Sequence, residues 1–253
     1  MEKEKLKFGT KEWSDVSINI LKGDCPNKCV VCYARANNSR YGSYSGELVL
    51  TNTFTNKVKK YADKVCMYPT THDIFEEHLP HHYDFLKRSL DIGNRFLIVS
   101  KGKDCLIALA KRLVEYREQI EFRISVSSLH EEIVSTMEPN APIVLERLET
   151  IKYLAKLEYK VSLSIEPFLG THMIELHNVV DKVGRFATGN VWIGFINHGK
   201  QRASLNGQYE GRAKEMIDAF DKFQTPEFAI EIYNKYRDYD NIKFKESIMK
   251  HIK

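Results

Sequence analysis

Short apolar segments rich in β-branched residues recur along the chain, and stretches with a helical spacing of apolar residues lie between them. Segments of this length and composition are typical of buried strands. We identify six candidate strands at residues 16–21, 64–68, 95–100, 121–127, 160–166 and 190–196. Residues 105–116 and 144–157 place leucine, isoleucine or alanine every third or fourth position, as amphipathic helices do. The alternation predicts successive βα units around a parallel sheet.

The pattern leaves open how this sheet closes. Six strands suit an incomplete barrel or an open, doubly wound sheet, because their order along the chain does not reveal whether the sheet curls. No repeat, low-complexity tract or Pro/Gly/Ser-rich linker divides the 253 residues. We therefore expect a single α/β domain.

Composition and charge narrow the class of protein only a little. The 38 basic and 34 acidic residues give a net charge of +4, which does not by itself indicate nucleic acid. Residues 1–7 are mostly charged, and no run of 18 or more apolar residues occurs. These features predict a cytoplasmic protein without a membrane span.

Three of the five cysteines stand close together, as Cys25, Cys29 and Cys32, with the spacing CxxxCxxC. Three thiolates on one loop suit three irons of a cubane iron–sulfur cluster, whereas the C-x₂-C-x₂-C run of bacterial ferredoxins needs a fourth cysteine. The fourth iron here would lack a protein ligand. An open position on a metal is where a small molecule binds and reacts.

Other interpretations of these cysteines are weaker but stay open. Zinc takes Cys₃His sites, although such sites usually show CxxC pairs and no fourth ligand is evident nearby. A zinc or iron–sulfur binding module without catalysis is therefore the alternative of a different class. Disulfides are disfavoured because the cysteine count is odd and the chain is long enough to form a core without them.

The cysteine motif, with the aromatic Tyr33 beside its last cysteine, resembles the signature of the radical S-adenosylmethionine (radical SAM) superfamily. The resemblance implies a single partial (β/α)₆ TIM-like barrel, with the cluster loop at residues 22–42 and a helical and strand extension at about 212–253. It implies a [4Fe-4S] cluster on Cys25, Cys29 and Cys32, with SAM on the open iron. Reduction by a flavodoxin- or ferredoxin-type partner would cleave SAM to methionine and a 5′-deoxyadenosyl radical.

Residues 71–74 (THDI) are similar to the TSDI segment of the spore photoproduct lyase-like branch of this superfamily, and residues 100–101 (SK) to its TK pair. Residues 137–147, which contain EPNAP and then an ER pair, are similar to another segment of that branch. The resemblance implies Thr71 and Asp73 as ligands of the SAM amino group and Arg147 as the ligand of its carboxylate. A helix cap or a surface arginine is the ordinary alternative.

Further polar residues lie at the predicted carboxyl ends of strands. Ser125 and Ser127 alternate on one face of the fourth strand, Glu166 ends the fifth, and Asn197 follows the sixth. By the same resemblance these four residues, together with Tyr33, are candidates for contacts with SAM. For the serines, hydrogen bonds to the neighbouring backbone are the alternative.

The substrate is not determined by any of these features. Photoproduct lyases carry a hydrogen-donor cysteine immediately before the TSD triplet, where this chain has Thr70. Cys66, Cys105 and Lys101 are weak candidates for a catalytic role, and a buried cysteine is commonly only a small apolar residue. A small molecule, or a substrate delivered by a partner protein, is the expectation.

A nucleic-acid lyase, repair enzyme or modification enzyme of the photoproduct-lyase type is the specific alternative. Arg35, Arg40, Tyr41 and Tyr44 mix basic and aromatic side chains near the cysteine motif, as nucleic-acid surfaces do. The same residues are equally suited to shield a cluster from solvent, which is the interpretation we favour.

Overall fold

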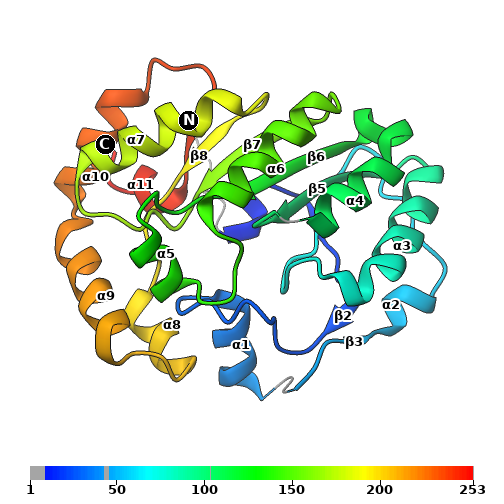
Figure 1. Cartoon of the computed structure of the whole chain (residues 1–253), viewed down its shortest axis with the longest axis horizontal. Helices are drawn as coiled ribbons and strands as arrows, with labels where there is room; N and C mark the ends of the chain where they lie inside the picture. The colour runs from blue at the N-terminus through cyan, green and yellow to red at the C-terminus, as the bar shows by residue number, and fades with distance from the viewer. Residues whose placement is uncertain (1–8, 43–45, 103, 253) are drawn as a thin grey trace, which may run out of the picture.

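The computed structural model describes residues 9–42, 46–102 and 104–252. Within these ranges, seven strands form one parallel sheet in the order β1-β4-β5-β6-β7-β8-β9, curved into a half-barrel (Figure 1). The partial barrel and the single domain are as predicted. The strands are β1 (Val16–Ser17), β4 (Val65–Tyr68), β5 (Arg95–Ser100), β6 (Ile120–Ser125), β7 (Lys160–Ile165), β8 (Val191–Ile193) and β9 (Ile242–Phe244).

Helices connect the strands and cover the sheet. Figure 1 shows α3, α4, α6 and α7 along one side of the sheet and α1, α8 and α9 together at another edge. Among the helices in the described ranges, none has both the length and the apolar character needed to cross a bilayer. The α-helices are α1 (Tyr33–Tyr41), α2 (Asn52–Thr55), α3 (Leu79–Asp91), α4 (Asp104–Arg112), α5 (Glu131–Met137), α6 (Val144–Lys156), α7 (Met173–Lys182), α8 (Gly199–Leu205), α9 (Gly211–Phe223), α10 (Pro226–Tyr236) and α11 (Glu246–Met249). The 3₁₀ helices are η1 (Gly9–Glu12), η2 (Glu76–His78), η3 (Val114–Gln119) and η4 (Gly184–Phe186).

The two faces of the sheet differ in chemistry. On β6, Phe122 and Ile124 belong to the main apolar core. Arg123 alternates with them, and its Nε donates a hydrogen bond of 2.8 Å to Ser162 Oγ on β7. Since successive side chains of a strand point to opposite faces, the helices pack on an apolar outer face, and the inner face is polar along β6 and β7. Polar groups inside the curve are where a bound molecule can be recognised.

The first predicted strand, 16–21, is wrong in its extent. The structure has only β1 there, and Ile18 extends the pairing by donating its N–H to Met67 O at 3.0 Å. At Asn19 the chain leaves the sheet, because the Asn19 amide binds the loop after β4. The chain then forms β2 (Leu21–Lys22), which pairs antiparallel with β3 (Val49–Leu50).

The seventh strand, β9, is missing from the six that the pattern predicted. It is three residues long and pairs with β8, so its sequence carries too little periodicity to identify it. Lys245, directly after β9, forms an ion pair of 2.9 Å with Glu12 and donates a hydrogen bond to Gly9 O. The two ends of the described chain therefore meet and cover the open side of the half-barrel.

Arg123 and two tryptophans fill the inside of the half-barrel below this closure. The Arg123 guanidinium lies 4.8 Å from the Trp13 ring centre and 5.1 Å from that of Trp192. Its Nη2 also pairs with Glu121 at 3.0 Å. Stacking on aromatic faces and an ion pair allow a cation to be buried there.

Candidate functional site

The three motif cysteines lie on the loop that joins β2 to α1, and Cys32 is the N-cap residue of α1. Their thiols are free. The loop turns tightly, with Lys28 N donating to Cys25 O and Cys32 N to Cys29 O. Gly23 opens the loop with a φ of 134°, and a Cβ there would lie 2.3 Å from Glu47 O, so only glycine fits.

A segment far along the chain holds this loop in place. Asn206, at the end of α8, donates its amide to Val30 O at 2.8 Å and to Cys32 O at 3.2 Å. Gln208 donates to Lys28 O at 3.3 Å. The sequence analysis missed both side chains, because nothing in the local pattern distinguishes an amide that contacts a loop some 175 residues away.

Charged groups lie beside two of the cysteines. Burial raises the pKa of the Cys25 thiol to about 11, and the nearby Asp73 carboxylate adds to the rise. Burial also raises the pKa of Cys29, an effect that Lys101 opposes and Glu138 reinforces. Burial therefore favours the protonated thiols of Cys25 and Cys29 in the metal-free chain, and binding of a metal would release these protons.

The chemistry of this donor set fits an iron–sulfur cluster. Three free thiols within eight residues are the ligands that such clusters use. As placed, however, no group of three or more His, Cys, Asp or Glu side chains in the described residues has an arrangement that could hold a metal ion. Thiol side chains on a loop reorient by rotation about χ1, so a cluster would draw them together.

Asp73, one of the residues assigned to the SAM amino group, lies in a ring of donors after β4. Its Oδ1 accepts from Ser100 Oγ at 2.6 Å and from Ile74 N at 2.8 Å. Its Oδ2 accepts from Lys101 N at 2.9 Å and from Asn27 Nδ2 at 3.2 Å. Asp73 therefore joins the ends of β4 and β5 to the cysteine loop, and its carboxylate is held rigidly beside Cys25.

Asn19 fixes the segment that contains Thr71, the other residue assigned to the amino group. Its Oδ1 accepts from Thr70 N at 2.7 Å and Thr71 N at 3.2 Å, and its Nδ2 donates to Thr70 Oγ1 at 2.6 Å. Tyr33 reaches across from α1 and donates its hydroxyl to Thr70 O. Tyr33 and Thr71 thus lie at one mouth of the half-barrel, near the cysteines.

Glu138 connects two cations at the centre of the site. Its Oε1 pairs with Lys101 Nζ at 2.6 Å and accepts from Ser127 Oγ at 3.2 Å. Its Oε2 pairs with Arg147 Nη2 at 2.6 Å. Burial by itself would raise the pKa of Glu138, but Lys101 and Arg147 outweigh this and lower it to about 2. Glu138 is therefore an ionised carboxylate in the interior.

The Arg147 guanidinium lies among protein oxygens, with hydrogen bonds from Nε and Nη1 and an ion pair at Nη2. Besides Glu138, it donates from Nε to Pro142 O at 2.7 Å and from Nη1 to Ser125 O at 3.0 Å. Arg147 is completely buried. This geometry indicates that Arg147 positions Glu138. The contact of Arg147 with SAM stays a prediction. Lys101, whose Nζ is on the Cys29 side of Glu138, is the cation nearer the cysteine loop.

Glu166 directly follows β7 and lies beside Lys245, which follows β9. Glu166 Oε2 and Lys245 Nζ are 3.4 Å apart. Burial raises the pKa of Glu166, and Lys245 opposes the rise. A Cβ on Gly194 would lie 2.8 Å from Lys245 Cβ and 3.1 Å from Glu166 Cγ, so glycine is required where these two side chains meet.

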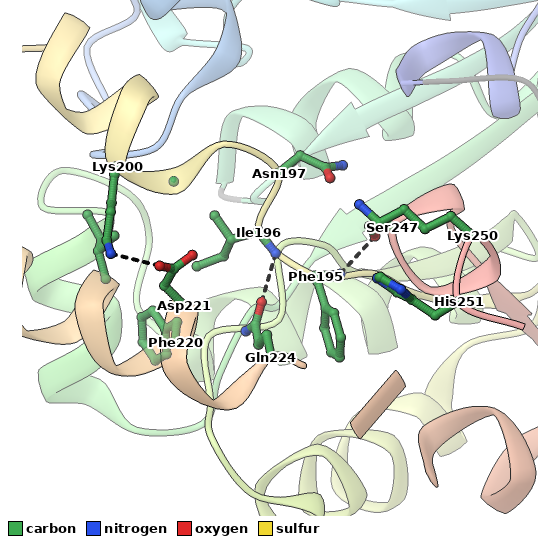
Figure 2. Close-up of a pocket in the computed structure, with 12 residues that line it drawn as sticks. Phe195, Ile196, Asn197, Lys200, Phe220, Asp221, Gln224, Ser247, Lys250 and His251 are labelled. Carbon is green, nitrogen blue, oxygen red and sulfur yellow. Dashed lines mark hydrogen bonds and ion pairs between the residues drawn. The ribbon is translucent and has the colours of Figure 1, made fainter. Parts of the chain in front are cut away.

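Asn197 lies apart from this group, at a pocket between β8, α9 and α11 with a volume of about 80 Å³. The pocket walls are tied by hydrogen bonds from Ile196 N to Gln224 Oε1 and from Phe195 N to Ser247 Oγ. Figure 2 shows the Asn197 side chain pointing away from Gln224. The predicted contact of Asn197 with SAM remains a prediction.

The two candidate donor cysteines face other surroundings. Cys66 is fully buried on β4 and belongs to the main core, on the helix-covered face of the sheet. Cys105 begins α4, and its Sγ donates to Ile74 O at 3.0 Å. Of the basic and aromatic residues near the motif, Arg40 and Tyr41 are exposed on α1, and Tyr44 lies outside the described residues.

Solved structures of spore photoproduct lyase have the same fold. The structure complexed with dinucleoside spore photoproduct matches with a TM-score of 0.57 at 16% identity, over 95% of this chain and 79% of that chain. A double mutant with bound AdoMet and dinucleoside spore photoproduct matches with a TM-score of 0.59 at 18% identity, over the same shares of the two chains.

Sequence comparison adds little to this. The uncharacterized protein ORF301 of Acidianus two-tailed virus is 29% identical over 113 residues, which cover 43% of this chain and 36% of that protein. The matched segment thus covers only about a third of the length of that viral protein. No family model matches the chain. The chain therefore has the partial-barrel fold of spore photoproduct lyase, which is the fold that the sequence resemblance implied.

Proposed function

We propose that the protein is a radical SAM enzyme. Cys25, Cys29 and Cys32 would hold a [4Fe-4S] cluster, and SAM would bind its open iron. The observation that carries the proposal is the CxxxCxxC loop at the mouth of a half-barrel with the fold of spore photoproduct lyase. When bound, the two cofactors would supply reductive cleavage of SAM and a 5′-deoxyadenosyl radical that abstracts hydrogen from the substrate.

Asp73 and Lys101 are suited to the two charges of the methionine part of SAM. Lys101 N donates to Asp73 Oδ2, so the Asp73 carboxylate lies next to the backbone of Lys101. The anionic side chain of Asp73 is near Cys25 and the cationic side chain of Lys101 is near Cys29. A carboxylate binds an ammonium group and a lysine binds a carboxylate through charge-assisted hydrogen bonds. The Glu138–Arg147 pair would hold the Lys101 ammonium in position.

Other residues close the site. Tyr33 bridges from α1 to the loop after β4, and Asn19 and Asn206 hold the two loops that face each other. Rigid walls of this kind position reactants and limit the access of water to a reactive centre. A flavodoxin- or ferredoxin-type protein would deliver the electron, because no second cysteine group for an auxiliary cluster occurs in the sequence.

The chain differs from photoproduct lyases at one residue that bears on the identity of the substrate. Thr70 occupies the place of the donor cysteine, and its hydroxyl accepts a hydrogen bond from Asn19. A hydroxyl is a much poorer hydrogen-atom donor than a thiol. We therefore favour radical chemistry on another substrate over photoproduct repair, with repair or modification of a nucleic acid as the alternative.

The test is anaerobic reconstitution of the full chain with iron and sulfide, followed by reduction with dithionite and addition of SAM. We expect about four irons per chain and formation of 5′-deoxyadenosine. Cys29→Ala should lose both, whereas Cys66→Ala, outside the loop, should keep its iron. Zinc in place of iron, or a cluster whose electron paramagnetic resonance spectrum ignores SAM, would refute the proposal.

A further inference from the structure

Arg202 lies on the face of α8 that is turned toward the cysteine loop. It precedes Asn206 by one helical turn, and Asn206 N donates to Arg202 O at 2.9 Å. Side chains four residues apart lie on the same face of a helix. Because the Asn206 amide contacts the backbone of Val30 and Cys32, Arg202 projects toward the same loop.

A carboxylate, a thiol and a phenol lie near the Arg202 guanidinium. Burial lowers its pKa, and the Glu166 carboxylate, the Cys32 thiol and the Tyr33 hydroxyl oppose that shift. These are the groups that surround it at the mouth of the half-barrel. Arg202 thus lies near the third cysteine, whereas Asp73 and Lys101 lie near the other two.

Arg202 has no partner of its own within residues 9–42, 46–102 and 104–252. Its side chain takes part in none of the hydrogen bonds or ion pairs found there, although it is half-buried. The nearest carboxylate, Glu166, is already paired with Lys245 at 3.4 Å. By contrast, Arg123 and Arg147, which are the buried arginines of the described part of the chain, are each paired with a carboxylate. A half-buried guanidinium with five unused donors is costly unless a ligand binds it.

SAM does not need this cation. Its single carboxylate has Lys101 as a partner, and its ribose, adenine and sulfonium carry no negative charge. An anion that binds Arg202 must therefore belong to another molecule, bound at the same mouth of the half-barrel as SAM. The planar fork of a guanidinium matches two oxygens of a phosphate or carboxylate.

We propose that Arg202 is the substrate-recognition residue of this site and that the substrate carries an oxyanion, a phosphate or a carboxylate, which its guanidinium binds. This inference rests on the proposed function, since it takes the Asp73 and Lys101 side of the mouth to hold SAM. It narrows the substrate to anionic molecules.

Binding is measured by anaerobic calorimetry on the cluster-loaded chain, saturated with SAM and left oxidised so that no turnover occurs. Three probes separate the sources of the oxyanion: inorganic phosphate, thymidylyl-thymidine for a phosphodiester, and succinate for a carboxylate. We expect at least one probe to bind. Arg202→Gln should weaken it about ten- to a hundredfold, as loss of charge-assisted hydrogen bonds does. Arg202→Lys should weaken it less.

Arg212→Gln is the matched control, because Arg212 is an exposed arginine on α9 that pairs with Glu132 and Glu215. It should bind the probe as the wild type does. In the wild-type chain, the bound probe should also protect Arg202, but not Arg212, from phenylglyoxal, which mass spectrometry detects without any variant.

Equal binding by wild type and Arg202→Gln, binding of none of the three probes, or modification of Arg202 despite a bound probe would each overturn the inference. The proposed function fails separately, through absence of the cluster or of 5′-deoxyadenosine. A chain that cleaves SAM but binds no oxyanion would therefore retain the enzyme assignment and lose only the role of Arg202.

Discussion

Lys101 Nζ and Glu138 Oε1 form an ion pair of 2.6 Å, with only 16% and 5% of their side chains exposed. The two residues are 37 positions apart and come from the ends of β5 and α5. Arg147 completes the group on the other oxygen of Glu138. A buried carboxylate thus balances two buried cations, one of which lies beside a cysteine of the proposed cluster.

Glu138→Gln should destabilise the chain strongly. The amide keeps the shape of the side chain but leaves Lys101 and Arg147 buried without a counter-charge, a change that typically costs about 3–5 kcal/mol. Urea denaturation followed by circular dichroism measures the loss. Glu132→Gln removes the exposed pair with Arg212 and should cost less than about 1 kcal/mol. Similar losses in the two variants would contradict the buried-pair interpretation.

The same carboxylate should affect the acid stability of the protein. Its pKa is about 2 in the folded chain and about 4.5 when unfolded. An acid with a depressed pKa stabilises the fold fully above its unfolded pKa, and the effect is lost as pH falls toward the folded pKa. The free energy of unfolding should therefore fall between about pH 4.5 and 2, and by less in Glu138→Gln than in the wild type. Parallel pH profiles would argue against an ionised Glu138.

His82 should make the stability depend on pH in a higher range. Its Nδ1 lies 2.6 Å from Tyr68 OH in the interior, and burial lowers its pKa to about 3, helped by His72, His78 and His81. The unfolded chain takes up this proton near pH 6.5, about the normal value for histidine. The free energy of unfolding should therefore decrease as pH falls from about 6.5 toward 3.

His82→Asn tests this prediction, because an asparagine offers Tyr68 a hydrogen-bonding group but does not titrate. The variant is expected to lose less stability than the wild type over that pH interval, as thermal unfolding in a series of buffers would show. His177→Asn, at an exposed histidine of α7 whose Nδ1 lies 3.4 Å from Tyr236 OH, is the control for replacing a histidine by asparagine. An unaltered slope in His82→Asn would mean that His82 is not the titrating group.

Asn206→Ala should loosen the cysteine loop. The substitution removes both hydrogen bonds to the loop backbone, at Val30 and Cys32, and leaves those carbonyl groups without their partner. We expect a lower iron content after reconstitution and faster bleaching of the cluster absorbance in air. Asn234→Ala, at an exposed position of α10, should behave as the wild type. Unchanged iron content and bleaching in Asn206→Ala would show that the loop holds its shape unaided.

Much of the fold could be predicted from local pattern. The strands near residues 64–68, 95–100 and 160–166 were found within a residue or two, because buried strands of a parallel sheet read as short β-branched runs. The first strand was wrong at Asn19, where a side-chain contact with the loop after β4 turns the chain away. The three-residue β9 was missed because its formation depends on β8 beside it.

Part of the candidate site could likewise be predicted from the sequence, and part could not. The spacing of Cys25, Cys29 and Cys32 could be found in the sequence, because the three residues lie on one short loop. The surroundings of Arg147 could not, because its acceptor on Ser125 becomes a neighbour only when α6 packs against β6, and Glu138 comes from a separate helix end. An arginine at the start of a helix has the same local sequence whether it is exposed or, as here, completely buried.

Local sequence was enough to predict the alternation of strands and helices and the cysteine motif, since both depend on residues within a few positions of each other. Contacts between distant segments establish which buried polar side chains hold the fold and which have no partner in it. Arg147 and Arg202 are the two cases: the first is enclosed by acceptors, and the second faces the cysteine loop without a partner among the described residues. The physical reason is that pairing depends on distance in space, and the groups concerned come from strands and helices far apart in the chain.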